Sequence, residues 1–125
     1  MKKTSLKTIV MIAIMVIAVL AMTVTAYAAD NYKGTITTST SWKTLATSTS
    51  GFNRNVTVFN SSATLDGLGP IRADIRMLGR NGNVVWQENK ACPGYGERTF
   101  WCGSDVYEIQ IKLANGYGTA RAYPG

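Results

Sequence analysis

Hydrophobic and polar residues alternate along residues 71–77, a pattern typical of a β-strand with one buried face. Apolar residues occupy every second position, and charged residues lie between them. The pair Asn81-Gly82 follows, and a second apolar run begins at Val84. Asn-Gly favours the positive φ angles of a type I′ turn. The pattern predicts a β-hairpin over residues 71–88, with its charged face, including Asp74, in water.

The same alternation returns at residues 107–113, where Tyr, Ile, Ile and Leu alternate with Glu, Gln and Lys. Asn115-Gly116 then supplies a turn, and a run of small and aromatic residues extends to Pro124. This pattern predicts a second hairpin, with a returning strand over residues 117–123.

Two further segments have β character. Residues 52–59 predict a strand. Thr and Ser fill 11 of the 17 positions from 34 to 50, which predicts an edge strand or hairpin with Ile36, Trp42 and Leu45 turned inward. The alternative for this tract is a disordered or O-glycosylated stalk. Trp42 and Trp86 lie within strand patterns and are expected in the core.

The fold class that these segments predict is all-β. No stretch after residue 28 shows the period of an amphipathic helix over three turns. About six or seven short strands, separated by turn signals, favour a small antiparallel β-sandwich over a closed barrel. Residues 29–125 are expected to form a single domain of this kind, preceded by an N-terminal signal helix.

The N-terminus has the three parts of a secretory signal peptide. Lysines at the start precede an apolar run from Ile9 to Val24, and Ala26-Tyr27-Ala28 fits the small-x-small cleavage rule. Residues 1–28 are therefore predicted to be a cleaved signal, and the mature protein to be secreted. The alternative is an uncleaved anchor that holds the same domain on the outer face of the membrane, and a membrane contact is expected only in that case.

The charge and composition of the chain limit the classes of partner and ligand that are expected. After Ala28 the chain has ten basic and seven acidic residues, and the basic ones are scattered. This balance is too weak to predict nucleic-acid binding. The chain contains no histidine and only two cysteines, so neither a zinc site nor a cofactor is expected.

Export makes a disulfide between Cys92 and Cys102 the default expectation. Such a bridge would close and stiffen a loop over residues 93–101, which contains aromatic and charged side chains. A stiff aromatic loop loses little entropy on binding. The ligand-binding residues predicted here are Tyr95, Glu97, Arg98 and Trp101. In the competing interpretation, Phe100 and Trp101 cap the core and the bridge only holds the loop.

An enzyme is not expected, because the usual nucleophile systems need a histidine base. Only a carboxylate-based hydrolase would remain, with a pair drawn from Glu88, Glu97, Asp105 and Glu108. The sequence around Asp66 and Asp105 lacks the loop pattern that a calcium site requires. No metal is therefore predicted. Sequons occur at Asn55 and Asn60.

Three functions fit an exported domain of this size. The first is a binding module that contacts a cell-envelope glycan or a surface protein through the predicted loop. The second is a bacteriocin-like antagonist or small toxin. The third is a structural protein of the extracellular matrix that assembles through edge strands.

Overall fold

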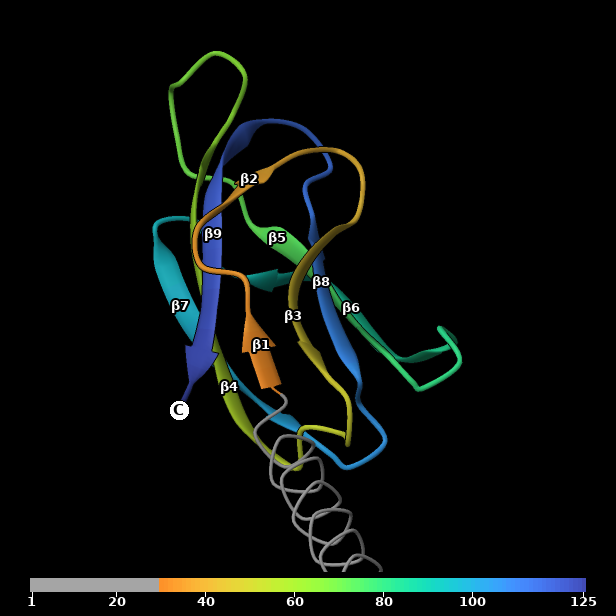
Figure 1. Cartoon of the computed structure of the whole chain (residues 1–125). Helices are drawn as coiled ribbons and strands as arrows, with labels where there is room; N and C mark the ends of the chain where they lie inside the picture. Colours follow the sequence, from red (N-terminus) through yellow and green to blue (C-terminus); the bar gives the residue numbers. More distant parts are fainter. Residues whose placement is uncertain (1–29) are drawn as a thin grey trace, which may run out of the picture.

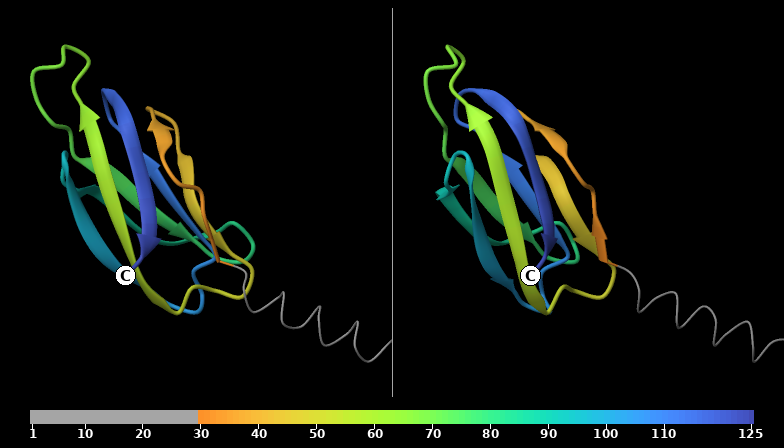
Figure 2. Two further views of the ribbon diagram at one scale, coloured as in Figure 1. Left: turned by 60° about the vertical axis from the view of Figure 1, so that its left-hand side comes forward. Right: turned by 90° about the vertical axis from the view of Figure 1, so that its left-hand side faces the viewer.

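The computed structural model describes residues 30–125, which form two antiparallel β-sheets. One sheet has five strands in the order β1-β3-β8-β5-β6, and the other has four in the order β2-β9-β4-β7. The sheets lie face to face as two layers (Figure 1, Figure 2). The strands are β1 (Asp30–Tyr32), β2 (Ile36–Thr38), β3 (Lys43–Ser48), β4 (Arg54–Ala63), β5 (Ala73–Leu78), β6 (Val84–Cys92), β7 (Gly96–Cys102), β8 (Glu108–Lys112) and β9 (Tyr117–Pro124).

The all-β prediction is confirmed for residues 30–125, which contain no helix. The described part has nine strands, more than the six or seven expected. Strands β1 and β2 have three residues each, too few for an alternating pattern to be recognised. Strand β7 occupies most of the segment predicted to be a loop.

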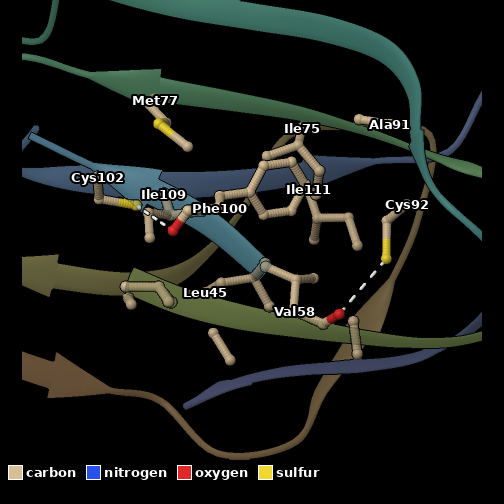
Figure 3. Packing of buried hydrophobic residues seen from close by; sticks show 14 of the residues in the cluster. Leu45, Val58, Ile75, Met77, Ala91, Cys92, Phe100, Cys102, Ile109 and Ile111 are labelled. Carbon is tan, nitrogen blue, oxygen red and sulfur yellow. Dashed lines mark hydrogen bonds between the residues drawn. The ribbon is translucent and has the colours of Figure 1, made fainter. Parts of the chain in front are cut away.

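The core lies between the two sheets and receives side chains from both (Figure 3). Ile75, Ile109 and Ile111 come from the five-stranded sheet and have no exposed surface. Val58 and Phe100 face them from the four-stranded sheet. Burying a side chain of this size contributes roughly 1.5–3 kcal/mol. The alternation at 71–77 and 107–113 thus marks the two central strands of the larger sheet.

Strands β5 and β6 form the hairpin predicted for residues 71–88. Its turn is not type I′, because Gly82 has a φ of 80° whereas Asn81 has no positive φ. The amide of Gly79 donates to the carbonyl of Asn83 at 2.7 Å and closes a longer loop. A type I′ turn needs a positive φ at two successive residues. A longer loop can reverse the chain with a positive φ at one glycine only.

Asp74 is buried, which corrects the prediction that it lies in water. The register shifts between Ala73 and Ile75, and Lys90 on the opposite strand has a φ of 56°. The Asp74 carboxylate accepts the backbone amide of Lys90 at 2.8 Å, and Arg72 Nε donates to the Lys90 carbonyl at 2.8 Å. Both side chains therefore bond backbone groups that the irregular ladder leaves open.

The second predicted hairpin is wrong, although both of its strands exist. Strand β8 lies between β3 and β5, whereas β9 lies between β2 and β4 in the other sheet. The turn at Asn115-Gly116 is therefore a corner between layers. A Cβ atom on Gly116 or Gly118 would lie 2.3 Å from a carbonyl oxygen of β4, so these glycines let β9 approach β4 closely.

The Thr/Ser-rich tract is ordered and forms β2 and β3, one strand in each sheet. Leu45 is fully buried, as predicted, and Ile36 is half-buried against the core. Trp42 is not in the core. It is half-buried beside the cations of Arg76 and Lys112. Trp86 is also only half-buried, at the margin of the core.

Strand β4 continues to Ala63, past its predicted end at residue 59. The ladder with β9 continues to Ala63 and accounts for this length. The buried Asn60 side chain lies within the added part, and its Nδ2 donates to the carbonyls of Ile71 at 2.9 Å and Pro93 at 3.4 Å. The Asn60 side chain therefore provides hydrogen bonds to backbone carbonyls of two connecting segments at one end of the domain. The sequon at Asn60 is inaccessible in the folded chain, whereas Asn55 is exposed.

The predicted signal peptide, residues 1–28, lies outside the described residues, as does the choice between cleavage and an anchor. Between residues 30 and 125, no helix is long and apolar enough to cross a membrane.

Candidate functional site

The segment from 93 to 101 is mainly a strand, which divides the predicted ligand-binding residues. Strand β7 pairs with β4 along its whole length. Successive side chains of a strand point to opposite faces of its sheet. Glu97 and Trp101 therefore share the outer face of the four-stranded sheet. Arg98 lies on the other face, with its guanidinium 4.7 Å from the ring centre of the inward-facing Phe100, and Tyr95 is exposed in the turn.

The predicted disulfide between Cys92 and Cys102 is wrong, since both thiols are free and buried. Cys92 ends β6 and Cys102 ends β7, and Figure 3 shows them at opposite ends of the core. A strand of this length spans about 20 Å. A disulfide requires Cα atoms within about 7 Å. Extended backbone between the cysteines thus keeps them apart despite their short separation in sequence.

Burial raises the pKa of both thiols above the ordinary value of 9.0, to about 11 for Cys92 and about 12 for Cys102. Nearby Arg72 and Arg98 oppose part of this rise at Cys92. The Cys92 thiol donates a weak hydrogen bond to the Val58 carbonyl at 3.5 Å. Both cysteines therefore behave as small core residues with protonated thiols.

Alkaline pH is expected to destabilise the fold through these thiols. In the unfolded chain they ionise near pH 9, whereas the folded state keeps its protons, so the free energy of unfolding falls as pH rises from 9 towards 11. The expected loss at pH 10 is on the order of 1 kcal/mol per thiol. Urea denaturation of the wild type and the Cys92→Ala/Cys102→Ala variant from neutral pH to about pH 10 measures it. If the free energy of unfolding depended on pH identically in both proteins, the two thiols would not be the source of the alkaline destabilisation.

Three aromatic side chains lie on neighbouring strands of the four-stranded sheet's outer face. Phe59 is on β4. Trp101 on β7 lies opposite Asn55, four residues from Phe59 along β4, and Tyr123 on β9 lies opposite Thr57, two residues from Phe59, so the three rings are staggered along the sheet. In the register, Phe59 lies between Glu97 and Arg121. The three aromatic residues, Glu97 and Arg121 are together called the aromatic face, and Figure 2 shows β4 running between the other two strands.

Hydrogen bonds and cation–π contacts fix the charged groups of the aromatic face. The Tyr123 hydroxyl donates to Glu97 Oε2, and this bond raises the pKa of Tyr123. The Arg121 guanidinium lies 5.4 Å from the Phe59 ring centre and 5.7 Å from that of Tyr123. Trp101 is 64% exposed, so most of its indole is open to a ligand. The face therefore combines one open ring with a carboxylate and a guanidinium already held in position.

The other face of β7 borders an open side of the domain, where β6 and β7 are the edge strands of different sheets. A hollow of about 400 Å³ lies there, and the rings of Trp86 and Phe100 meet edge to face at 5.6 Å along it. Arg98 Nη1 pairs with Glu88 and donates to the Ala91 carbonyl at 3.0 Å. Arg98 thus links β7 to β6 across the gap between the sheets.

The four acids considered for a hydrolytic pair lie apart from one another. Glu97 belongs to the aromatic face and bonds Tyr123, whereas Glu108 accepts a hydrogen bond from Thr44 on the five-stranded sheet. Glu88 is paired with Arg98, and Asp105 lies in the turn after β7. Among residues 30–125, no group of three His, Cys, Asp or Glu residues could hold a metal ion.

Of the five residues on the aromatic face, the sequence predicts Glu97 and Trp101 as ligand-binding but does not predict Phe59, Arg121 or Tyr123. These three lie on β4 and β9, far from β7 in sequence. Their outward parity on each strand was visible in the alternation. Their common face depends on β4 pairing with both β7 and β9, which no local pattern encodes.

The fold and site define a two-sheet antiparallel β domain with an aromatic outer face. No protein-family model, curated protein or solved structure matches the chain.

Proposed function

We propose that this protein is a secreted, non-catalytic binding module that holds a cell-envelope glycan on its aromatic face. The observation that carries the proposal is that Trp101, Phe59 and Tyr123 share the outer face of three adjacent strands, with Glu97 and Arg121 on either side of Phe59 in the register. Export rests on the signal pattern of residues 1–28.

A flat face of this composition suits sugar rings. The apolar side of a pyranose packs against an aromatic ring, and its hydroxyls need donors and acceptors beside that ring. Trp101 supplies the open ring, while Glu97 and Arg121 supply the acceptor and the donors. Because Glu97 is bonded to Tyr123 and Arg121 lies beside the rings of Phe59 and Tyr123, these two charged side chains lose less entropy when a ligand binds. A surface protein remains the competing partner for the same face.

Replacing Trp101 with Ala is expected to weaken glycan binding at least about tenfold, the effect of losing an exposed aromatic anchor. Sedimentation of the purified mature protein with insoluble peptidoglycan and with chitin measures the bound fraction. Leu68→Ala is the matched control, because it removes an apolar side chain that is 86% exposed in the distant loop between β4 and β5. Denaturation midpoints confirm that each variant is folded.

Arg98→Gln separates the aromatic face from the opposite side of β7. This variant is expected to bind as well as the wild type while unfolding at a lower urea concentration, since Arg98 links β6 and β7. Equal binding losses in Arg98→Gln and Trp101→Ala would place the ligand on the open side instead. If the wild type sediments with neither polymer, the glycan proposal fails, and growth inhibition of related strains then tests a secreted antagonist.

A further inference from the structure

A second aromatic side chain lies against two cations on the outer face of the other sheet. Trp42 precedes β3, and its indole centre is 4.3 Å from the Arg76 guanidinium of β5 and 4.9 Å from the Lys112 ammonium of β8. All three side chains are half-buried. Two strands of the five-stranded sheet thus bring two positive charges to the ring of a residue that precedes a third strand.

Neither cation forms an ion pair within residues 30–125, which contain every acidic residue of the chain. Asp74 lies opposite Lys112 in the register, but its carboxylate accepts the backbone amide of Lys90 instead. Two neighbouring positive charges repel each other, and the face of an indole offsets only part of that repulsion. The arrangement is therefore complementary to an anion.

Hydrogen bonds to neighbouring side chains hold the Arg76 side chain in position. Its Nε donates to Gln110 Oε1 at 2.6 Å, and Gln110 Nε2 in turn donates to Glu108, which also accepts the Thr44 hydroxyl. This chain of hydrogen bonds uses Nε and leaves the two Nη groups without a hydrogen-bond partner among the described residues. Those Nη groups are the fork with which arginine binds carboxylates and phosphates.

A shallow hollow of about 540 Å³ adjoins Trp42 and extends the site. Its lining residues include Lys33, Lys43, Ser39 and Thr44. Basic residues and hydroxyl-bearing residues beside a half-buried indole match a sugar ring that bears a negative group. The neutral aromatic face lies on the other sheet, so the two surfaces can be occupied at once.

We propose that Trp42, Arg76 and Lys112 form a second binding site, which takes the anionic groups of an acidic glycan. The shared chemistry is a carboxylate or phosphate carried on a sugar or polyol chain. This site is independent of the glycan contact proposed for the aromatic face.

Binding to polygalacturonate, which carries carboxylates, and to polyglycerol phosphate, measured at low and high salt, tests the proposal. Arg76→Gln/Lys112→Gln is expected to lose about tenfold in affinity for the preferred polymer. The control Arg80→Gln/Lys90→Gln removes the same charge from exposed positions elsewhere and is expected to lose less than about threefold, through the general field of the protein. Trp101→Ala is expected to bind both polymers as the wild type does.

Each outcome decides the question. Preference for one polymer, with selective loss in the Arg76/Lys112 variant, supports the site and identifies its anion. Equal losses in both double variants would show unspecific charge attraction and overturn the proposal, as would binding to neither polymer. A loss in Trp101→Ala alone would assign the acidic glycan to the aromatic face instead.

Discussion

Iodoacetamide added to the folded protein is expected to leave Cys92 and Cys102 unmodified for as long as a denatured sample needs for complete alkylation. The reactive species is the thiolate, and both side chains have no exposed surface. With the pKa of Cys92 raised to about 11 and that of Cys102 to about 12, the thiolate fraction at neutral pH falls roughly 100-fold and 1,000-fold. Exclusion of the reagent slows the reaction further.

Intact mass measurement distinguishes the alternatives. Two added groups after denaturation without reductant, and none before it, are the expected result. A denatured chain that resists alkylation until it is reduced would contain the disulfide, and β7 could not then run extended from Gly96 to Cys102. Rapid labelling of the folded protein would show that the thiols are not in the core.

Free thiols also change what the redox state should do to binding. A loop closed by a disulfide would lose its shape on reduction, and ligand binding would fall with it. Strand β7 is held instead by its ladder with β4 and by the inward side chains of Phe100 and Cys102. The glycan binding proposed for the aromatic face is therefore expected to be the same with and without reductant.

The local pattern predicted individual strands better than their partners. The alternation at 71–77 and 107–113 correctly predicts β5 and β8, because one face of each strand packs against the other sheet while the opposite face is outside. The turn at Asn115-Gly116 was also correct as a turn. Whether the chain then returns to the same sheet or crosses to the other depends on packing against β4, which lies about fifty residues earlier.

The candidate site likewise shows that a local pattern predicts single residues but not which strands lie side by side. The clustering of aromatic and charged residues within a short segment predicts Trp101 and Glu97 as site residues, and the structure places both on one face. Arg98 came from the same cluster but points the other way, since the segment is a strand. Phe59 and Tyr123 join the site only through the register of β4 with its two neighbours, and register is a tertiary property.

Gly51→Ala is expected to lower the free energy of unfolding by at least about 3 kcal/mol. Gly51 is buried between β3 and β4 with a φ of 88°, and a Cβ atom there would lie 2.0 Å from the Ser104 carbonyl oxygen. Relief of that clash must move the turn after β7. The same turn accepts the amides of Phe52 and Asn53 at 3.0 and 3.2 Å, so the movement breaks bonds between two connecting segments.

Gly34→Ala separates the two costs that Gly51→Ala combines. Gly34 also has a positive φ, 71°, but a Cβ atom there would have no neighbour within 4 Å, so only the backbone strain of about 1–2 kcal/mol is expected. Urea denaturation of both variants, with unchanged dependence on urea concentration, gives the comparison. Similar losses of unfolding free energy in the two variants would mean that the turn at Ser104 moves away from the added Cβ atom at little cost. A clearly larger loss at Gly51 would show that close contact between the β3–β4 connection and the turn after β7 stabilises this end of the fold.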